Sequence, residues 1–388
     1  RNRKDIMFLL EHDAKLLLAT SGVPVPEGIL LTAPLNDATL PAPGPWVVKA
    51  QVSVGGRGKA GGIALANTRD AVDTAVTRIL GLEIKGRHVH SVRVEAQVKD
   101  AHESYLGYIL DPGAGGVRVL FAPDGGVDIE DGGEALKSKI AAPDEASMIA
   151  ATNALAAGQP DALQTVITDA AARLVPAFLQ HEAMMLEINP LFVLDDGGWV
   201  AGDAKMVIDE NALFRQPEVS KFIDARDPVY WETQAKRDHG FDYVEIDPQG
   251  EIGLLTTGAG LSMMLVDELI GSGLKPFNFL DLRSGGLRGD PSRIIQVMNW
   301  MADGPNVGVV LVNIFAGITH LGEFTELLLR AFKETPRLQV PVVARLVGNG
   351  LEDAREIIEE SGEPITLEPD LAKAIALASS HLNRGTSS

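Results

Sequence analysis

The amino-acid sequence predicts two domains of different class, an α+β domain followed by an α/β domain. Its 388 residues are enough for two or three domains that each bury a core of their own. Between residues 220 and 240, charged side chains crowd around a proline, a composition typical of a connection between domains. We therefore place the first domain at residues 1–227 and the second at residues 241–388.

Runs of strands set apart from helices predict the α+β class for the first domain. Alternating apolar residues and β-branched side chains predict strands at residues 47–52, 92–98, 105–110, 117–121, 186–194 and 199–201. Helical spacing of apolar residues predicts helices at residues 6–20, 68–80 and 165–180. The alanine-rich stretch 143–164 indicates a helix followed by a loose loop.

A regular succession of strand, glycine-containing loop and helix predicts a parallel sheet in the second domain. The predicted strands are residues 252–255, 277–282, 309–314 and 340–346. Glycine turns at the carboxyl ends of parallel strands line a crevice, and the helix N-termini behind them favour an anionic ligand. The pattern therefore indicates an anion pocket at this edge of the sheet, the alternative being a set of tight connections.

Composition narrows the classes of function. The chain carries 53 Asp and Glu against 34 Lys and Arg, and a net charge of −19 argues against nucleic acid or an anionic membrane as partner. The absence of cysteine excludes disulfides, thiolate catalysis and cysteine-ligated metals. The sequence shows no apolar run of the roughly 18 residues that a spanning helix needs, and residues 1–11 contain no apolar core of a signal peptide. We predict a cytoplasmic enzyme.

A glycine-rich loop with cations follows the first strong strand pattern directly. Residues 55–63 read Gly-Gly-Arg-Gly-Lys-Ala-Gly-Gly-Ile. Glycines let backbone N–H groups approach an anion, and Arg57 and Lys59 supply charge that a nucleotide triphosphate needs neutralised. The spacing is not that of a P-loop, because Ala60 stands where a magnesium-binding hydroxyl would follow the lysine. The alternative is a solvated basic turn.

Oxygen donors for a magnesium ion follow about 130 residues later. Glu187, Asn189 and Asp203 are hard ligands of the type that magnesium prefers. Alternation along a strand puts Glu187 and Asn189 on the same face. The alternative is a capped hairpin, since Asp195-Asp196-Gly197-Gly198 is a strong turn and Asn189 can shape the bend before Pro190.

Over nearly its whole length, the chain resembles the β subunit of ADP-forming or GDP-forming succinate–CoA ligase. That family has an ATP-grasp domain followed by a flavodoxin-like ligase domain. The motifs that carry the resemblance are Gly55–Ile63, Glu187–Pro190, Asn211–Pro217, Asn278–Asp281 and Leu311–Phe315.

The resemblance implies a role for individual residues. The nucleotide-binding residues are Lys49, Gly56, Arg57, Gly58, Glu95, Val98 and Glu103. The first four hold phosphates, the next two meet the base and its edge, and the last meets the ribose. Magnesium is assigned to Asn189 and Asp203. Acid-binding residues on helix N-termini and loops of the second domain are Thr257, Arg283, Gly317, Ile318 and Thr319.

The resemblance also implies the chemistry and a partner. ATP or GTP with Mg²⁺ activates a carboxylate as an acyl phosphate, and a phosphohistidine on an α subunit relays phosphate as coenzyme A displaces it. The α subunit brings the coenzyme A site. None of the eight histidines of this chain has neighbours that mark a nucleophile, so the resemblance alone supplies that histidine.

Departures from the family pattern gather where the acid binds. They are Thr257 in place of Asn, Leu282–Gly285 in place of a triple glycine, Ala316 in place of Gly, and His320-Leu321 in place of Arg-Cys. Arg283 and Arg288 are added cations. A guanidinium can form a bidentate pair with an extra carboxylate or sulfonate of the acid. The alternative is that both arginines contact the α subunit or solvent, and the role of His320 stays open.

Three functions therefore compete. The first is the β subunit of a ligase acting on succinate or a related acid such as malate or citrate. The second is an ATP-grasp ligase that passes its acyl phosphate to an amine, against which the regular second domain argues. The third is a non-catalytic nucleotide-binding partner, against which intact Lys49, Asn189 and Asp203 argue.

Overall fold

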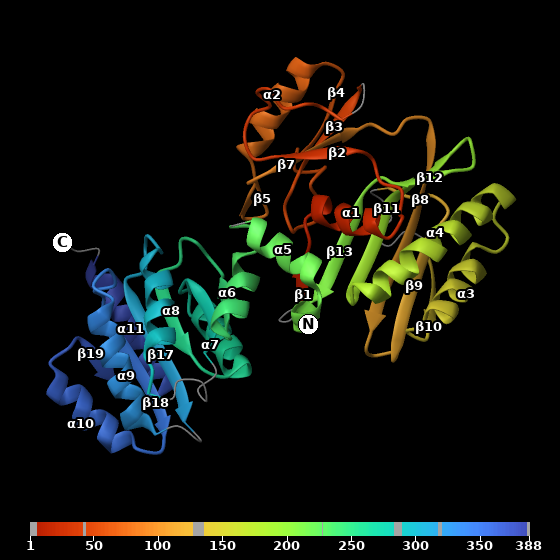
Figure 1. The fold of residues 1–388 in the computed structure, drawn as a ribbon. Helices are drawn as coiled ribbons and strands as arrows, with labels where there is room; N and C mark the ends of the chain where they lie inside the picture. Colours follow the sequence, from red (N-terminus) through yellow and green to blue (C-terminus); the bar gives the residue numbers. More distant parts are fainter. Residues whose placement is uncertain are drawn as a thin grey trace. The chain divides into compact units, whose positions relative to one another are not determined.

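A computed structural model of the chain describes residues 6–41, 44–126, 136–226, 228–282, 289–316 and 320–385. The chain divides into two compact units, Arg1–Val229 and Tyr230–Ser388 (Figure 1). Helix α6 (Trp231–His239) falls in the second unit, although the sequence pattern left it in the connection. The first unit mixes antiparallel sheets with helices and the second is an α/β unit, so the predicted fold class is confirmed.

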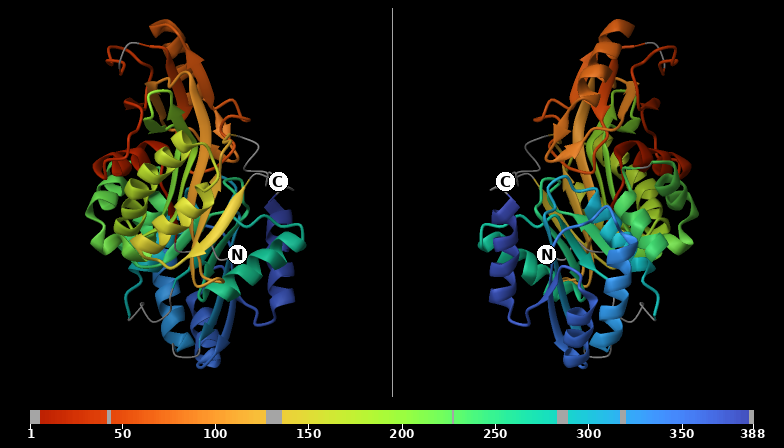
Figure 2. Two further views of the ribbon diagram at one scale, coloured as in Figure 1. Left: turned by 90° about the vertical axis from the view of Figure 1, so that its right-hand side faces the viewer. Right: turned by 90° about the vertical axis from the view of Figure 1, so that its left-hand side faces the viewer.

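A large antiparallel sheet forms one half of the first unit. Its strands, in sheet order, are β1 (Ile6–Phe8), β13 (Ala204–Asp209), β11 (Ala183–Leu194), β8 (Ala101–Asp111), β9 (Gly116–Ala122) and β10 (Lys137–Ala141), with β12 (Trp199–Ala201) paired to β11. Helices α3 (Glu145–Ala156) and α4 (Asp161–Gln180) pack against each other and against this sheet (Figure 2). The oxygen donors predicted for magnesium lie on β11 and just before β13, in neighbouring strands.

A smaller antiparallel sheet forms the other half. Its strands, in order, are β2 (Gly28–Leu31), β7 (Val92–Ala96), β3 (Trp46–Ala50) and β4 (Ile63–Ala66). Helix α2 (Arg69–Leu80) covers the sheet with Val72, Val76 and Ile79 buried, and Thr68 caps its N-terminus by accepting a hydrogen bond from Ala71 N. The glycine-rich loop joins β3 to β4, and the hairpin of β5 (Glu83–Ile84) and β6 (Arg87–His88) follows α2.

Several predicted elements were wrong at their ends. The predicted helix 6–20 begins only at α1 (Glu11–Thr20), because Met7 is buried in β1 and residues 6–8 pair with residues 207–209 of β13. Pairing with a strand about 200 residues away overrides a local helical pattern. The helix and the loop predicted over 143–164 both form, but the loop covers only residues 157–160, because α4 already begins at Asp161.

Helix α4 corrects the expectation about apolar runs. Within the described ranges, it is the one helix long and apolar enough to span a membrane, with a mean hydropathy of 1.2 over 18 residues. Half of that window is buried in the first unit, where Val166, Ala170 and Leu174 lie in its interior. Its burial is that of a core helix.

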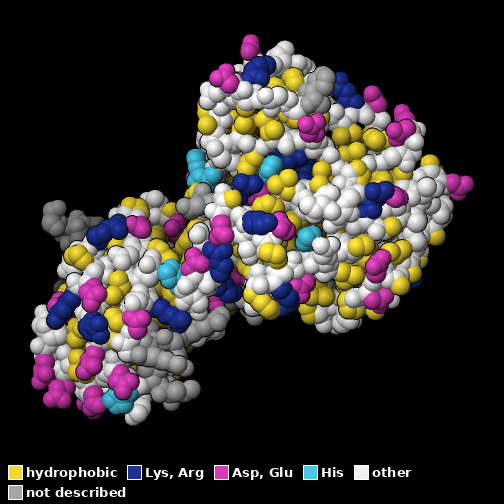
Figure 3. All heavy atoms as spheres, viewed as in Figure 1, with side chains coloured by type: hydrophobic (Ala, Val, Ile, Leu, Met, Phe, Trp, Pro, Cys, Tyr) yellow, Lys and Arg dark blue, Asp and Glu magenta, His cyan; other side chains and the backbone are white. Residues whose placement is uncertain are grey.

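The second unit is a doubly wound parallel sheet. Its parallel strands, in sheet order, are β15 (Ile252–Thr256), β17 (Val309–Ala316), β18 (Val342–Gly348) and β19 (Ile365–Leu367). Successive residues of β17 point to opposite faces, where Leu311 packs with α7 (Ala259–Gly271) and α11 (Leu371–Gly385). Val310 packs with α8 (Ser292–Ala302), α9 (Leu321–Glu334) and α10 (Leu351–Ser361). Acidic side chains gather over α10 in Figure 3, in keeping with the negative net charge.

The strand predicted at 277–282 joins the sheet in an unexpected way. Strand β16 (Asn278–Asp281) pairs antiparallel with β14 (Asp242–Glu245). On the other side of β16, the Asn278 side chain bonds to β15 in place of part of a backbone ladder. Asn278 Oδ1 accepts from Leu254 N at 2.8 Å, and Asn278 Nδ2 donates to Leu254 O at 2.9 Å. Backbone bonds from Phe277 N to Ile252 O and from Leu282 N to Thr256 O continue the contact. The layer therefore runs β14-β16-β15-β17-β18-β19.

Candidate functional site

The first unit contains a cavity of about 500 Å³ that is lined by residues of both sheets. The glycine-rich loop lines it from one side, and β11 with the start of β13 lines it from the other. Predicted site residues in its wall are Gly56, Arg57, Gly58, Glu103, Asn189 and Asp203. Lys49, Glu95 and Val98 are predicted site residues that do not line it.

The glycine-rich loop is held by its own backbone. Gly62 N donates to Arg57 O at 2.8 Å, and Ala50 N donates to Gly62 O at 2.7 Å, so the loop closes against the end of β3. Gly56 has a φ of +82°, a conformation that glycine adopts without cost. A Cβ at Gly62 would lie 2.8 Å from the Ile84 side chain. Glycines are therefore required by geometry at both ends of the loop.

The predicted magnesium donors meet in the cavity. Glu187 and Asn189 both line it, as alternation along β11 predicts. The turn at residues 195–198 also forms, with Leu194 N donating to Gly198 O at 2.9 Å, so the two interpretations of this segment are compatible. Asn189 Oδ1 accepts from Gly126 N at 2.8 Å, which orients the amide.

The oxygen atoms of these residues suit magnesium. Asp203 Oδ1 accepts from the Ala204 backbone N–H at 2.8 Å, and Oδ2 accepts from Arg57 Nη2 at 2.6 Å. Among the described residues there is no group of three His, Asp or Glu side chains placed to hold a metal ion. Magnesium in nucleotide sites takes only one or two protein carboxylates and completes its shell with phosphate and water, so Asn189 and Asp203 fit such an ion.

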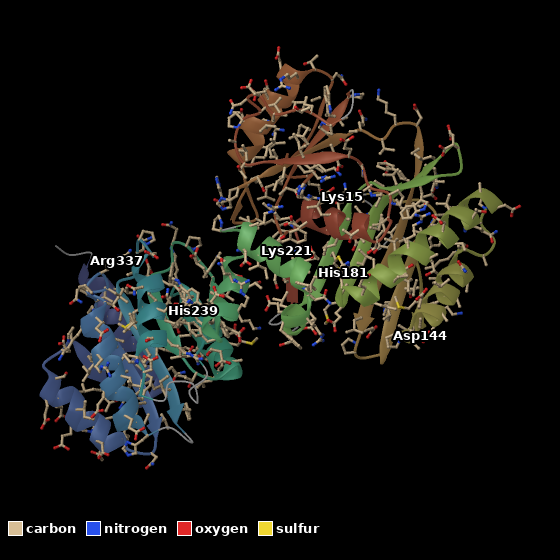
Figure 4. All side chains as sticks on the ribbon, viewed as in Figure 1. Lys15, Asp144, His181, Lys221, His239 and Arg337 are labelled. Atoms are coloured by element: carbon tan, nitrogen blue, oxygen red, sulfur yellow. The ribbon has the colours of Figure 1, made fainter. Side chains whose placement is uncertain are left out.

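Beside the cavity lies a buried charge cluster that the sequence reasoning missed in part. The charge cluster consists of Glu11, Lys15, Lys49, Arg93, Glu95 and the carbonyl of Gly202. It joins α1, the small sheet and the loop before β13, and Figure 4 labels Lys15 within it. The available signal was the pair Glu11 and Lys15, spaced four residues apart on the buried face of a helix.

Lys49 is fully engaged within the charge cluster. Its Nζ lies 2.9 Å from Glu11 Oε1, 2.7 Å from Glu95 Oε1 and 2.7 Å from Gly202 O. Burial alone would lower the pKa of the Lys49 ammonium, but the carboxylates of Glu11, Glu95 and Asp203 raise it above its ordinary value. Lys49 is thus a permanent cation whose three donors face protein oxygens in this structure.

Glu95 is a counter-ion in this structure and not a wall of the cavity. Only 2% of the residue is exposed, and its carboxylate accepts from Arg93 Nε at 2.6 Å and from Lys15 Nζ at 2.8 Å, besides Lys49. Val98, two residues past β7, is half-buried and also lies outside the cavity wall. Neither side chain lines the cavity, so their expected contact with the base stays a prediction.

Arg57 connects the charge cluster to the predicted metal site. Its Nη1 donates to Glu11 Oε2 at 2.7 Å and to Ala50 O at 3.0 Å, while Nη2 donates to Asp203 Oδ2 at 2.6 Å. Burial would raise the pKa of the Glu11 carboxyl, but Lys15, Lys49 and Arg57 hold it well below its usual range. Arg57 therefore has its position set by two carboxylates.

The predicted acid-binding residues lie in the second unit. Thr257 is buried at the carboxyl end of β15, and the next residue, Gly258, donates its N–H to Asp281 Oδ1 at 2.8 Å. His320 precedes α9, with Nε2 3.4 Å from Asp353 Oδ2. Four of the predicted acid-binding residues and one further added arginine fall outside the described residues, namely Arg283, Gly317, Ile318, Thr319 and Arg288.

Comparisons with known proteins match both units. Residues 8–193 match the ATP-grasp domain and residues 255–379 match the CoA-ligase domain. The chain is 38% identical over 387 residues to succinate–CoA ligase [ADP-forming] subunit β of Chloroflexus aurantiacus, covering 97% of this chain and 100% of that protein. It is 36% identical over 385 residues to the probable malate–CoA ligase subunit β of Mesorhizobium japonicum, covering 95% of this chain and 96% of the relative.

A solved structure supports the fold. ATP citrate lyase from Methanothrix soehngenii, in complex with citrate and coenzyme A, superposes with a TM-score of 0.75 over 97% of this chain and 100% of that chain, at 18% identity. At this identity the likeness concerns the fold alone.

An ATP-grasp domain joined to a CoA-ligase domain defines the acid–thiol ligases that use a nucleotide. This chain belongs to the family of succinate–CoA ligase β subunits, and the resemblance inferred from its motifs is confirmed. Its relatives over nearly the full length carry ADP-forming and GDP-forming names.

Proposed function

We propose that this chain is the nucleotide-binding β subunit of a ligase that makes an acyl-CoA from a small di- or tricarboxylic acid, coenzyme A and ATP or GTP. The observation that carries the proposal is the cavity in which the glycine-rich loop faces Asn189 and Asp203. Family membership supports the acid–thiol reaction, and the match of residues 255–379 to the CoA-ligase domain argues against an amine acceptor.

In the proposed site the backbone of Gly56, Arg57 and Gly58 receives the phosphates. Loop N–H groups in a glycine-rich turn are fixed dipoles that favour an anion. Lys49 adds its charge after turning from the charge cluster, and Glu103, at the opposite wall, contacts the ribose. Glu95 and Val98 meet the base through their backbone only, since the Glu95 side chain is taken by cations.

Asn189 and Asp203 would hold Mg²⁺ together with phosphate oxygens. The ion would neutralise charge as phosphate is transferred. Arg57 keeps the Asp203 carboxylate turned toward the cavity through the 2.6 Å ion pair, which fixes one ligand before the ion arrives. Ala204 N–H does the same for the second oxygen of Asp203.

The partner in the proposal is an α subunit that carries the phosphohistidine and the coenzyme A site. The relatives' designation as β subunits supports a partner of this kind. Of the buried histidines that the structure describes, His12 accepts a hydrogen bond from Arg93, and burial lowers the pKa of His181. We keep the prediction that the assembly is cytoplasmic.

The acid is proposed to bind at the helix N-termini of the second unit, through Thr257 and Gly317 to Thr319, with Arg283 beside them. Of the two relatives described above, one is named for succinate and the other for malate. The altered loop at 282–285 supports an acid other than succinate, because it adds a guanidinium that a third anionic or polar group of malate or citrate can engage.

Co-purification with an α subunit tests the function. The complex would be assayed with ATP, coenzyme A and a panel of succinate, malate and citrate, with ADP and acyl-CoA measured by mass spectrometry. We expect acyl-CoA formation that needs both subunits. Hydroxamate trapping of an acyl phosphate, with no acyl-CoA from any acid, would instead favour a ligase with a different acceptor.

A further inference from the structure

Four cationic side chains reach the cavity wall, and they are not equivalent. They are Arg57, Lys59, Lys85 and Lys205. The charge of Arg57 is already offset by Glu11 and Asp203, and Lys49 lies behind the wall in the charge cluster. A nucleotide triphosphate with one Mg²⁺ keeps about two negative charges, and Lys49 offsets one of them when it turns from the charge cluster. The other calls for a second cation that the protein does not already neutralise.

Lys85 comes from a separate element, the two-residue turn between β5 and β6. Glu83 pairs with His88 and Ile84 with Arg87, which leaves Lys85 and Gly86 as the turn. Ile84 is buried in the core of the small sheet and anchors the hairpin. The turn is therefore fixed to the same sheet that carries the glycine-rich loop.

The backbone of Lys85 is held in an uncommon conformation. Its φ is +50°, and that of Gly86 is +76°. Turns of this kind need positive φ at both residues, for which Asn, Asp or Gly is usual and lysine is not. A side chain bearing Cβ is strained there. Backbone strain of this kind is found at functional sites, so a strained lysine at the wall of the cavity indicates a role in ligand binding.

The Lys85 ammonium lies beside the glycine-rich loop. A Cβ built on Gly56 would be 3.4 Å from Lys85 Nζ and 3.6 Å from Cε, and one built on Gly55 would meet nothing within 4 Å. The missing side chains thus leave room for the lysine and for an anion next to it. Within the described ranges, Lys85 makes no side-chain hydrogen bond or ion pair, so its charge is uncompensated there.

We propose that Lys85 binds the terminal phosphates of the nucleotide from the open side of the glycine-rich loop. The inference rests on the proposed nucleotide site and adds a residue to it. Gly56 precedes Arg57, whose guanidinium reaches the predicted metal ligand Asp203, so Lys85 lies at the metal end of the loop. The β- and γ-phosphates gather at the metal in phosphoryl transfer.

Binding measurements on four variants test the proposal. The dissociation constants of Mg-ATP, Mg-ADP and AMP would be measured by calorimetry for the wild-type chain and for Lys85→Ala, Lys85→Arg, Lys85→Asn and Arg87→Ala. Arg87 is the matched control, because it is an exposed cation of the same hairpin that does not line the cavity. We expect Lys85→Ala to weaken Mg-ATP binding about tenfold, Mg-ADP less and AMP not at all.

Lys85→Asn separates charge from turn geometry. Asparagine suits the positive φ better than lysine, so this variant should keep or raise the melting temperature while binding Mg-ATP as weakly as Lys85→Ala. Lys85→Arg should retain most of the affinity. Recovery of affinity in Lys85→Asn, or equal small effects of Lys85→Ala and Arg87→Ala, would overturn the inference. A wild-type chain that binds no Mg-ATP would overturn the nucleotide site itself.

Discussion

Lys15 and Lys49 share the same three acceptors. Lys15 Nζ lies 2.7 Å from Glu11 Oε1, 2.8 Å from Glu95 Oε2 and 2.8 Å from Gly202 O. Lys49 Nζ lies 2.9 Å, 2.7 Å and 2.7 Å from the same two carboxylates and carbonyl. If Lys49 turns to a phosphate, every acceptor that it leaves still has Lys15 as a partner.

The charges balance in that second state. With Arg57 and its second partner Asp203 included, three carboxylates then face three cations, Lys15, Arg57 and Arg93, in place of four. A buried carboxylate without a cation is costly. Lys49 can move because Lys15 stays with the carboxylates that Lys49 leaves. Lys15 is accordingly a positioning residue for Lys49.

The first prediction concerns Lys15. Lys15→Met should hold Lys49 in the charge cluster and weaken Mg-ATP binding by about tenfold or more. Without Lys15, the departure of Lys49 would leave three carboxylates, those of Glu11, Glu95 and Asp203, facing only Arg57 and Arg93. The double variant Lys15→Met with Glu95→Gln should recover affinity, since one carboxylate fewer needs neutralising. Calorimetry below each variant's melting temperature measures both. A folded double variant that still binds Mg-ATP weakly would contradict the role of Lys15 in freeing Lys49.

The second prediction separates Asp203 from Lys49. Either Asp203→Ala or Lys49→Ala should reduce ATP-dependent turnover by a factor of tens to a thousand, corresponding to roughly 2 to 4 kcal/mol of transition-state stabilisation. Asp203 is partly exposed, so its variant should keep the wild-type melting temperature, whereas Lys49 is 8% exposed and its loss should also lower stability. Full activity in folded Asp203→Ala would remove it from the site.

The third prediction is a dependence of stability on pH. Burial, with the guanidinium groups of Arg93 and Arg226, lowers the pKa of His12 from 6.5 to about 3. Between these values the unfolded chain binds the proton and the folded chain does not, so the His12 contribution is complete above pH 6.5 and is lost as the pH falls toward 3. The free energy of unfolding should fall by up to about 1.4 kcal/mol per pH unit in this window.

His12→Asn is the control for that measurement. The asparagine Oδ1 can accept the Arg93 hydrogen bond in place of Nδ1, but it does not titrate. Urea unfolding at several pH values between 4 and 7 should therefore give a shallower pH dependence for the variant. An unchanged slope would mean that other groups cause the acid sensitivity.

The fourth prediction concerns Asn278 in the second unit. Asn278→Ala leaves the N–H and C=O of Leu254 unpaired in the interior, which should cost about 2 to 4 kcal/mol. Amide exchange followed by mass spectrometry should show faster exchange over β15. Asn306→Ala is the matched control, because Asn306 is an exposed amide bonded to Gln249. Equal protection of β15 in both variants would refute the role of the side chain in the layer.

The fifth prediction concerns the acid. If Arg283 recognises an extra anionic group, Arg283→Ala should lose about 1.5 to 3 kcal/mol of specificity for citrate, the most highly charged of the three acids, and little for succinate or malate. Turnover by the assembled enzyme on the three acids measures this. An equal small change for every acid would leave Arg283 as a surface or interface residue.

The sequence by itself determined the features that depend on neighbours along the chain. The parallel strands of the second unit, the glycine-rich loop and the shared face of Glu187 and Asn189 follow from local periodicity and from glycine. Each of these patterns lies within one strand, one loop, or one succession of strand, loop and helix. For that reason a single sequence suffices to read them.

The tertiary structure decided what depends on distant contacts. Strand β1 exists because β13 pairs with it, and β16 meets β15 through the Asn278 side chain. The charge cluster draws Lys15 and Glu95 together across 80 residues. Sequence shows that such residues carry charge. Only the folded chain removes them from water, and this desolvation converts them from solvated surface groups into obligatory partners.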